Sequence, residues 1–179
     1  MRRTHRGTTL AIAVLLVSAA LPLSACSDAA DGPDPSAVIE VSGTGQGTKT
    51  RDGDMRGKAM RKAGLPGSEM RGAAYSHTLE LSDPRVSGEQ VTMADCDYTE
   101  QGDAVVGDCW GTVVITNDGG TWDGTFTGTT AWSTTEPEPV YDINATYLGS
   151  GEYAGLRFVA QAEGTDTACS MTGRIEPAG

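Results

Sequence analysis

Apolar and polar residues alternate with a period of two along most of this 179-residue chain, from Ala37 onward. Alternation of this kind is typical of β-strands that bury one face, and helical spacing is almost absent. Gly, Asp-Gly and Pro divide the pattern into eight expected strands, near residues 37–42, 72–81, 88–98, 104–117, 120–130, 140–148, 155–163 and 167–176. Eight short strands predict an all-β fold, a single antiparallel β-barrel, with a β-sandwich as the alternative.

The clearest turn signal is Asn-Asp-Gly-Gly at 117–120, because Asp-Gly favours the positive φ angles of a two-residue type I′ turn. A turn centred on 118–119 sets Ile115 opposite Trp122 and Val113 opposite Gly124. Large residues then meet small ones on one face, while threonines occupy most of the other. A slip by one residue would exchange the two faces, so the pattern specifies this register.

The preceding hairpin is expected to turn at Gly102-Asp103, which sets Cys96 directly opposite Cys109. The two cysteines fall at a non-hydrogen-bonded position, where side chains on neighbouring strands are closest. In an exported protein this arrangement predicts a Cys96–Cys109 disulfide, with Cys169 left over and buried. The alternative is three unpaired buried thiols.

Val91 and Met93 alternate out of phase with Cys96 on the same expected strand. A β-bulge inserts one extra residue into a strand and so changes which residues share a face. We therefore expect a bulge near Ala94, which would bring all three side chains to the apolar face.

The first 25 residues have the composition of an export signal. Arginines at positions 2, 3 and 6 precede an apolar run, 10–23, that is too short to span a bilayer. The sequence Leu-Ser-Ala-Cys at 23–26 then resembles a bacterial lipobox. We expect residues 1–25 to be a cleaved lipoprotein signal peptide and Cys26 to carry the lipid. The alternative is an ordinary secretory leader with an accidental cysteine.

A lipid on Cys26 would anchor the protein to the outer face of the cytoplasmic membrane. In a host with two membranes, it would face the periplasm or be anchored to the outer membrane. Each buried methylene is worth roughly 0.8 kcal/mol, so two acyl chains give stable anchoring. Residues 26–35 are rich in Asp, Pro and Gly and are expected to form a tether, with 27–35 spanning about 17 Å as a flexible coil. Residues 36–179 are expected to form the folded domain.

Without the leader, the chain has 10 basic and 24 acidic residues and a net charge of −14. Nucleic-acid binding needs clustered Lys and Arg to neutralise phosphates, so no nucleic-acid partner is expected. Seven of the ten basic residues fall within 44–71, a Gly- and Met-rich segment predicted to be a long loop. A short helix is possible there, with Met55, Ala59, Met60 and Ala63 on one face.

Three interpretations of this basic segment remain open. It is a mobile solvated loop, an arm lying on the protein's own acidic surface, or a contact for anionic lipid headgroups beside the anchor. The candidate membrane contacts are Arg56, Lys58, Arg61 and Lys62.

Residues that would carry catalysis are scarce in the chain. His77 is the single histidine after the leader, and its alternation with leucines favours a packed or edge histidine over a catalytic one. There is no Cys-x-x-Cys motif and no Gly-Lys-Ser/Thr phosphate loop, so no metal, no cofactor and no catalytic residue are expected. The residues that could line a ligand cavity, although aromatic residues in such a chain more often form core, are His77, Trp122, Phe126, Tyr153 and Arg157.

Three segments carry a resemblance to a known group of proteins: 82–88 (SDPRVSG), 119–124 (GGTWDG) and 151–156 (GEYAGL). They resemble signatures of uncharacterised bacterial secreted proteins and lipoproteins whose fold is similar to the allene oxide cyclase and dirigent β-barrel. The resemblance covers residues 72–176 and implies a barrel. Members of that wider group cyclise lipid-derived epoxides or steer radical coupling by shaping a cavity around the substrate. None of their catalytic residues matches a position here.

The expected function is therefore a membrane-anchored, non-catalytic module that binds a small apolar ligand or a partner. A cyclase or isomerase acting by confinement in the barrel is one alternative. A structural envelope protein with a filled core is the other. The interior of the barrel distinguishes these possibilities, because binding and confinement both need a cavity.

Overall fold

The computed structural model describes residues 37–133 and 138–179, which form one antiparallel sheet. Its strands are β1 (Ile39–Arg51), β2 (Asp54–Arg56), β3 (Glu69–Leu81), β4 (Gly88–Gln101), β5 (Ala104–Asn117), β6 (Gly120–Ser133), β7 (Val140–Gly149), β8 (Leu156–Gly164) and β9 (Ala168–Pro177). Eight of these match the strands expected from the alternation, which confirms the all-β fold class. All nine belong to one sheet, so they do not form the two stacked sheets of a sandwich.

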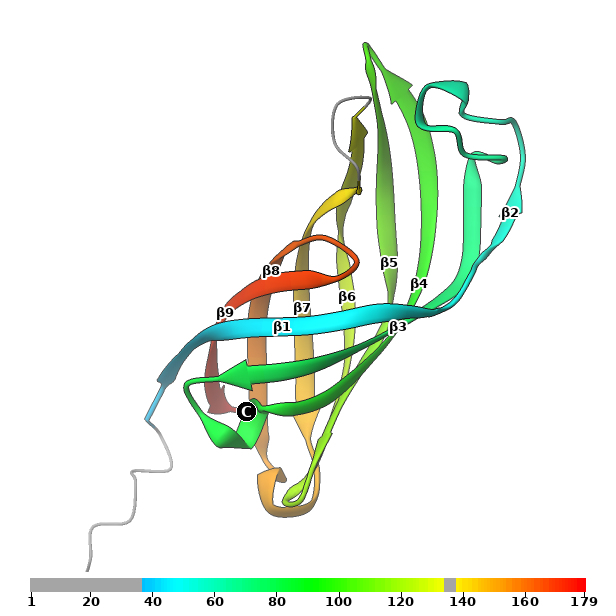
Figure 1. The fold of residues 1–179 in the computed structure, drawn as a ribbon. Coiled ribbons are helices and arrows are strands. Elements are labelled where there is room, and N and C mark those ends of the chain that lie inside the picture. The colour runs from blue at the N-terminus through cyan, green and yellow to red at the C-terminus, as the bar shows by residue number, and fades with distance from the viewer. Residues whose placement is uncertain (1–36, 134–137) are drawn as a thin grey trace, which may run out of the picture. The chain divides into compact units, whose positions relative to one another are not determined.

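The sheet closes on itself through β1 (Figure 1). This strand pairs with β9, where Ile39 lies opposite Ile175, and with β3, where Gly47 lies opposite His77. The two pairings complete a barrel-like ring of hydrogen bonds through eight strands, and β2 pairs only with β3. Closure leaves no long unpaired edge on the eight strands of the ring.

Glycines on the inner face of β1 allow this closure. Gly43, Gly45 and Gly47 occupy successive inward positions, and a Cβ on Gly45 would lie 2.8 Å from both Cys169 Sγ and Leu79 Cδ2. Side chains from β9 and β3 thus fill the space that the glycines leave. The sequence prediction ended this strand at residue 42, because a strand whose inward positions are glycine has no apolar alternation to detect.

Both predicted hairpin registers are confirmed. Asn117 pairs with Gly120, and Ile115 lies opposite Trp122. In the β4–β5 hairpin Cys96 lies opposite Cys109, and the two form a disulfide, while Cys169 is a buried free thiol. The alternative of three unpaired thiols is therefore excluded.

The expected bulge near Ala94 is wrong, because β4 pairs with β5 in an unbroken register from Glu89 to Gln101. Val91 instead points outward and is 48% exposed. The inward positions of β4 include polar residues, so apolar alternation gave the wrong face there. The register shift occurs in β3, between Met70 and Ala73.

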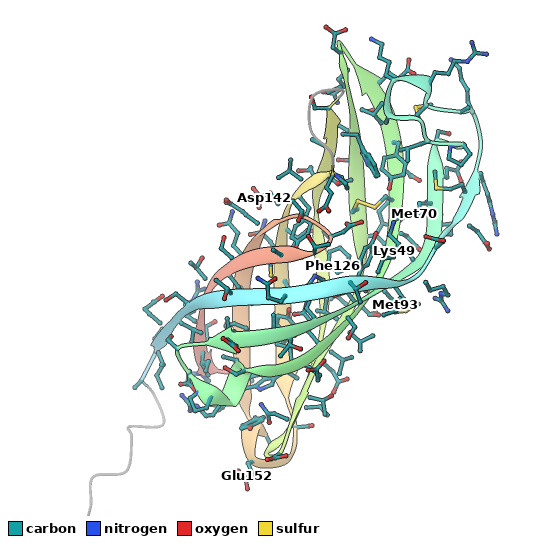
Figure 2. All side chains as sticks on the ribbon, in the orientation of Figure 1. Lys49, Met70, Met93, Phe126, Asp142 and Glu152 are labelled. Atoms are coloured by element: carbon teal, nitrogen blue, oxygen red, sulfur yellow. A yellow bond between two sulfur atoms is a disulfide. The ribbon has the colours of Figure 1, made fainter. Side chains whose placement is uncertain are left out.

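One end of the ring is closed by its own side chains and turns. Trp122 is fully buried, stacks on Tyr153 with ring centroids 5.1 Å apart, and donates from Nε1 to the Arg85 carbonyl oxygen at 2.7 Å. The Tyr153 hydroxyl donates to Asn117 Oδ1 at 2.6 Å. These contacts join the turns after β3, β5 and β7. Figure 2 labels Glu152 at this closed end.

The predicted loop at 44–71 is shorter than expected, since 44–51 continue β1 and 69–71 begin β3. We call the intervening residues 52–68 the strap. It contains the short strand β2 and one 3-10 turn, η1 (Arg61–Ala63), in place of the expected helix. Within the described ranges, no helix is long and apolar enough to cross a membrane. The signal peptide, the tether and Cys26 lie outside those ranges.

Candidate ligand cavity

The open end of the ring contains a cavity of about 360 Å³. It lies between the strap, the inner faces of β3 to β7 and the turn between β8 and β9. A volume of this size is at the small end of the range for ligand pockets, roughly 300–1,000 Å³. Its wall includes Lys49, Asp52, Met55, Leu65, Met70, Tyr75, His77, Gln90, Thr92, Ala94, Cys96, Tyr98, Cys109, Phe126, Trp132, Tyr141, Ile143 and Asp166.

Most of this wall is apolar and rigid. The disulfide joins β4 to β5 within the lining, and Phe126 lies on the next strand of the ring (Figure 2). From the strap, Met55 and Leu65 add apolar contacts on one side of the mouth. Strands and a disulfide hold their side chains more precisely than loops do, so the cavity is largely preformed.

Two polar side chains deep in the cavity are hydrogen-bonded to the protein. Gln90 donates from Nε2 to Thr92 Oγ1 at 3.3 Å and accepts from the Tyr147 hydroxyl at 3.1 Å. Both Gln90 and Thr92 are buried. Satisfied polar groups of this kind stabilise the cavity wall and leave no need for a ligand at that point.

Two other lining side chains are different, because their buried nitrogens have no well-aligned hydrogen-bond partner among the described residues. They are Nε1 of Trp132 and both ring nitrogens of His77, whose side chain is only 5% exposed. Burial lowers the pKa of His77 below its usual value, although the carboxylate and the backbone of Asp166 act in the opposite direction. The ring is therefore neutral near pH 7. Each unpaired buried polar group costs about 1–3 kcal/mol.

An ion pair lies at the mouth of the cavity. The Lys49 ammonium is 3.5 Å from the Asp166 carboxylate and 5.7 Å from the centre of the Tyr75 ring. Burial raises the pKa of Asp166, and the nearby Lys49 opposes this shift. Burial also raises the pKa of Tyr98 to about 12, so that its phenol stays protonated. The Asp166 carboxyl group therefore binds a proton at a higher pH than an exposed aspartate does.

The strap spans part of the open end and is attached to the tip of the β4–β5 hairpin. Lys62 donates to the Gly102 carbonyl oxygen and lies 3.7 Å from the Asp103 carboxylate. Within the strap, Met60 is buried and its backbone pairs with that of Leu65. The open end thus has a covering segment that is held by the pairing of β2 with β3, by the Tyr98 N–H that donates to the Ser68 carbonyl oxygen, and by Lys62.

The four candidate membrane contacts all lie on the strap and are exposed. Arg56 is 3.7 Å from Asp54, and Lys62 is held by the hairpin tip. Lys58 and Arg61 have no ion pair with any of the described residues. Part of the basic segment therefore lies on the protein's own acidic groups, as one of the three interpretations anticipated.

The predicted cavity residues are divided by the structure. His77 and Phe126 line the cavity, whereas Trp122 and Tyr153 fill the closed end. Arg157 forms an ion pair with Glu176 at 2.5 Å and does not line the cavity. The cavity therefore brings together only two of the five residues.

Trp132, Lys49 and Asp166 were not among the predicted site residues. Trp132 could have been found, because it continues the alternation of Trp122 and Phe126 along β6. Lys49 and Asp166 could not, because their proximity depends on the extension of β1 beyond residue 42.

No group of three or more His, Cys, Asp or Glu side chains is placed to hold a metal ion in the described part of the chain. Comparison of the chain with protein-family models, with curated proteins and with solved structures finds no match. The cavity is therefore the feature of the described residues that indicates a function.

Proposed function

We propose that this protein is a lipid-anchored bacterial envelope protein that binds a small, mainly apolar ligand in the cavity without transforming it. The observation that carries the proposal is the cavity of about 360 Å³, with an apolar wall and a few polar groups. A structural protein with a filled core would have no use for such a space. The cavity therefore favours a binding role over the structural alternative.

The position of the mouth supports capture of a ligand from outside the membrane. β1 begins at the closed end and runs for 13 residues, roughly 40 Å, to the open end. A tether attached before Ile39 would thus join the domain at the closed end (Figure 1). Contact between the strap and the same membrane would require the domain to lie along the surface, because the tether is short.

An isomerase or cyclase is the second candidate, and Asp166 favours it. A partly buried carboxyl group with a raised pKa beside a neutral histidine can act as a proton donor and acceptor pair. The resemblance to cavity-based cyclases is consistent with this chemistry. The binding proposal is simpler, because the Asp166 carboxylate is paired with Lys49 and makes no hydrogen bond to a ring nitrogen of His77.

The proposal is tested by purifying the wild-type lipoprotein from its own membranes and examining it by native mass spectrometry. A bound compound of constant mass, released unchanged, supports the binding module. A compound that the protein converts on incubation supports the isomerase. If nothing co-purifies and no lipid or small aromatic raises the melting temperature, both ligand-based proposals fail.

A further inference from the structure

We propose that the ligand carries an uncharged oxygen acceptor, such as a carbonyl, ether or hydroxyl group, which Trp132 recognises by donating a hydrogen bond from Nε1. This inference rests on the proposed binding function and deepens it by naming the class of ligand. It starts from Nε1 of Trp132, a cavity residue whose buried donor has no partner in the part of the chain that the structure describes.

The indole nitrogen sets the first requirement. An indole N–H is a donor only, so its partner must be an acceptor. Most buried polar groups in proteins are paired, and an exception needs a reason such as an absent ligand. Neighbouring atoms cover this nitrogen, so a ligand oxygen held in the cavity reaches it only when the indole ring turns toward the cavity. An alkane cannot satisfy this requirement, and neither can an ammonium group.

The charges around the cavity exclude the anionic acceptors. Asp52 and Asp166 line the cavity against the single cation Lys49, and that cation is already paired with Asp166. Glu138 adds a further carboxylate next to Asp166. A carboxylate ligand would enter this negative, partly desolvated region without a free cation to pair with. An uncharged oxygen meets the same donor at no such cost.

His77 is consistent with the same ligand class. Its neutral imidazole has one donor and one acceptor nitrogen, and both are unpaired in the cavity wall. A ligand oxygen can therefore accept from His77 as well as from Trp132, and a hydroxyl can also donate. The rest of the wall contacts the ligand through the Phe126 and Tyr141 rings and the disulfide.

The test compares ligands of equal chain length with the full-length Cys26→Ser protein, isolated after export. The probes are octane, 2-octanone, octanoate and octylammonium. We expect 2-octanone to bind about tenfold more tightly than octane, and to bind more tightly than either charged probe. In a proton–nitrogen correlation spectrum, the indole N–H resonance of Trp132 should move downfield with 2-octanone and not with octane.

Two variants test whether the Trp132 donor causes the preference for 2-octanone. Trp132→Phe keeps an aromatic ring but removes the donor, and should abolish the preference for 2-octanone while octane binds as before. Trp110→Phe is the matched control, because Trp110 is 38% exposed and lies under Arg71 rather than in the cavity. It should leave the preference unchanged.

The remaining outcomes would overturn the inference. Equal binding of octane and 2-octanone, or tighter binding of octanoate or octylammonium, would rule out recognition of an uncharged acceptor. The cavity would still be a binding site. A preference for 2-octanone that survives in Trp132→Phe would show that Trp132 is not the donor responsible for it. If none of the four probes binds, the proposed binding function fails together with this inference.

Discussion

Gly47 of β1 lies directly opposite His77 of β3, and the imidazole ring fills the space that a side chain at position 47 would need. A Cβ atom on Gly47 would lie 2.3 Å from His77 Cδ2 and 2.5 Å from the Ser76 carbonyl oxygen. The strand that closes the ring therefore depends on a glycine to pass over a cavity residue.

Replacing Gly47 by Val should consequently destabilise the protein by about 1–3 kcal/mol, because the added atoms overlap both a ring and a backbone oxygen. Urea denaturation would measure the change in the free energy of unfolding. The control is Thr48→Val, which places the same side chain at the next, outward position of β1 and should change it by less than about 0.5 kcal/mol. A Gly47→Val protein as stable as the wild type would contradict the pairing of β1 with β3.

The disulfide should contribute about 3 kcal/mol to stability, because Cys96 and Cys109 are 13 residues apart and the bond constrains the unfolded chain. The double variant Cys96→Ala with Cys109→Ala should lose this amount in urea denaturation without reductant. Cys169→Ala, which removes the buried free thiol, serves as the comparison. Reductant should lower the free energy of unfolding of this variant by as much as it lowers that of the wild type. Peptide mapping that links Cys169 to another described cysteine would disprove the observed register.

The stability contributed by neutral His77 should fall as the pH is lowered. Its pKa is lowered in the folded protein by burial, so below the ordinary value near 6.5 the unfolded chain binds a proton that the folded chain does not. The contribution is fully present above that value and declines toward the folded pKa, at no more than about 1.4 kcal/mol per pH unit.

The measurement is the free energy of unfolding at pH 7.5 and pH 5.5 for the wild type and for His77→Phe. The wild type should lose more stability between the two pH values than the variant does. Lys49 and Asp166, which line the cavity together with His77, are present in both proteins, so their own titration largely cancels in the difference. An equal loss in both proteins would mean that His77 is not kept neutral by burial.

The sequence predicted the strands well where one face is apolar and the other polar. The hairpin registers followed from two short turns, and the disulfide followed from the register. The prediction failed where that contrast is absent. In β1 the inward residues after Val41 are Gly43, Gly45 and Gly47. In β4 the inward residues include Gln90 and Thr92, which hydrogen-bond to each other, and Gln90 also accepts from Tyr147.

The cavity was harder to predict than the sheet. Trp122 and Trp132 both point inward from β6, yet one is packed at the closed end and the other lines the cavity. Alternation tells which face a residue occupies, but it does not tell how far along the strand the interior is filled. That depends on the turns at the closed end and on the strap, which are set by contacts between distant segments.

The lipid anchor is a prediction from the leader and from Cys26, and a single substitution tests it. Cys26→Ser should move the protein from the membrane to the soluble or secreted fraction, because it removes the acyl chains that hold it. Fractionation with a high-salt wash distinguishes a lipid anchor from charge-based attachment. Retention of the variant on washed membranes would rule out lipidation as the anchor.

The strap should bind anionic vesicles weakly, through Lys58 and Arg61, which form no ion pair with the described residues. Each basic residue near such a surface is worth about 1 kcal/mol, and added salt screens the attraction. Sedimentation of the Cys26→Ser protein with vesicles containing phosphatidylglycerol should lose most of its binding when Lys58 and Arg61 become Gln. Changing Arg157 and Arg174 to Gln instead is the matched control. If the protein ignores the vesicles at low ionic strength, the strap is not a membrane contact.

The most direct test of the account is whether filling the cavity abolishes ligand binding. Fluorescence titration with the apolar probe N-phenyl-1-naphthylamine should saturate at one site per wild-type chain. Ala94→Leu and Ile143→Phe, which add atoms to the cavity wall, should each weaken binding by tenfold or more, while Thr112→Leu on the exposed face of β5 should not. Saturable binding that is lost only in the filled variants is the predicted result, and absent binding, or equal binding by filled and unfilled proteins, would contradict the account.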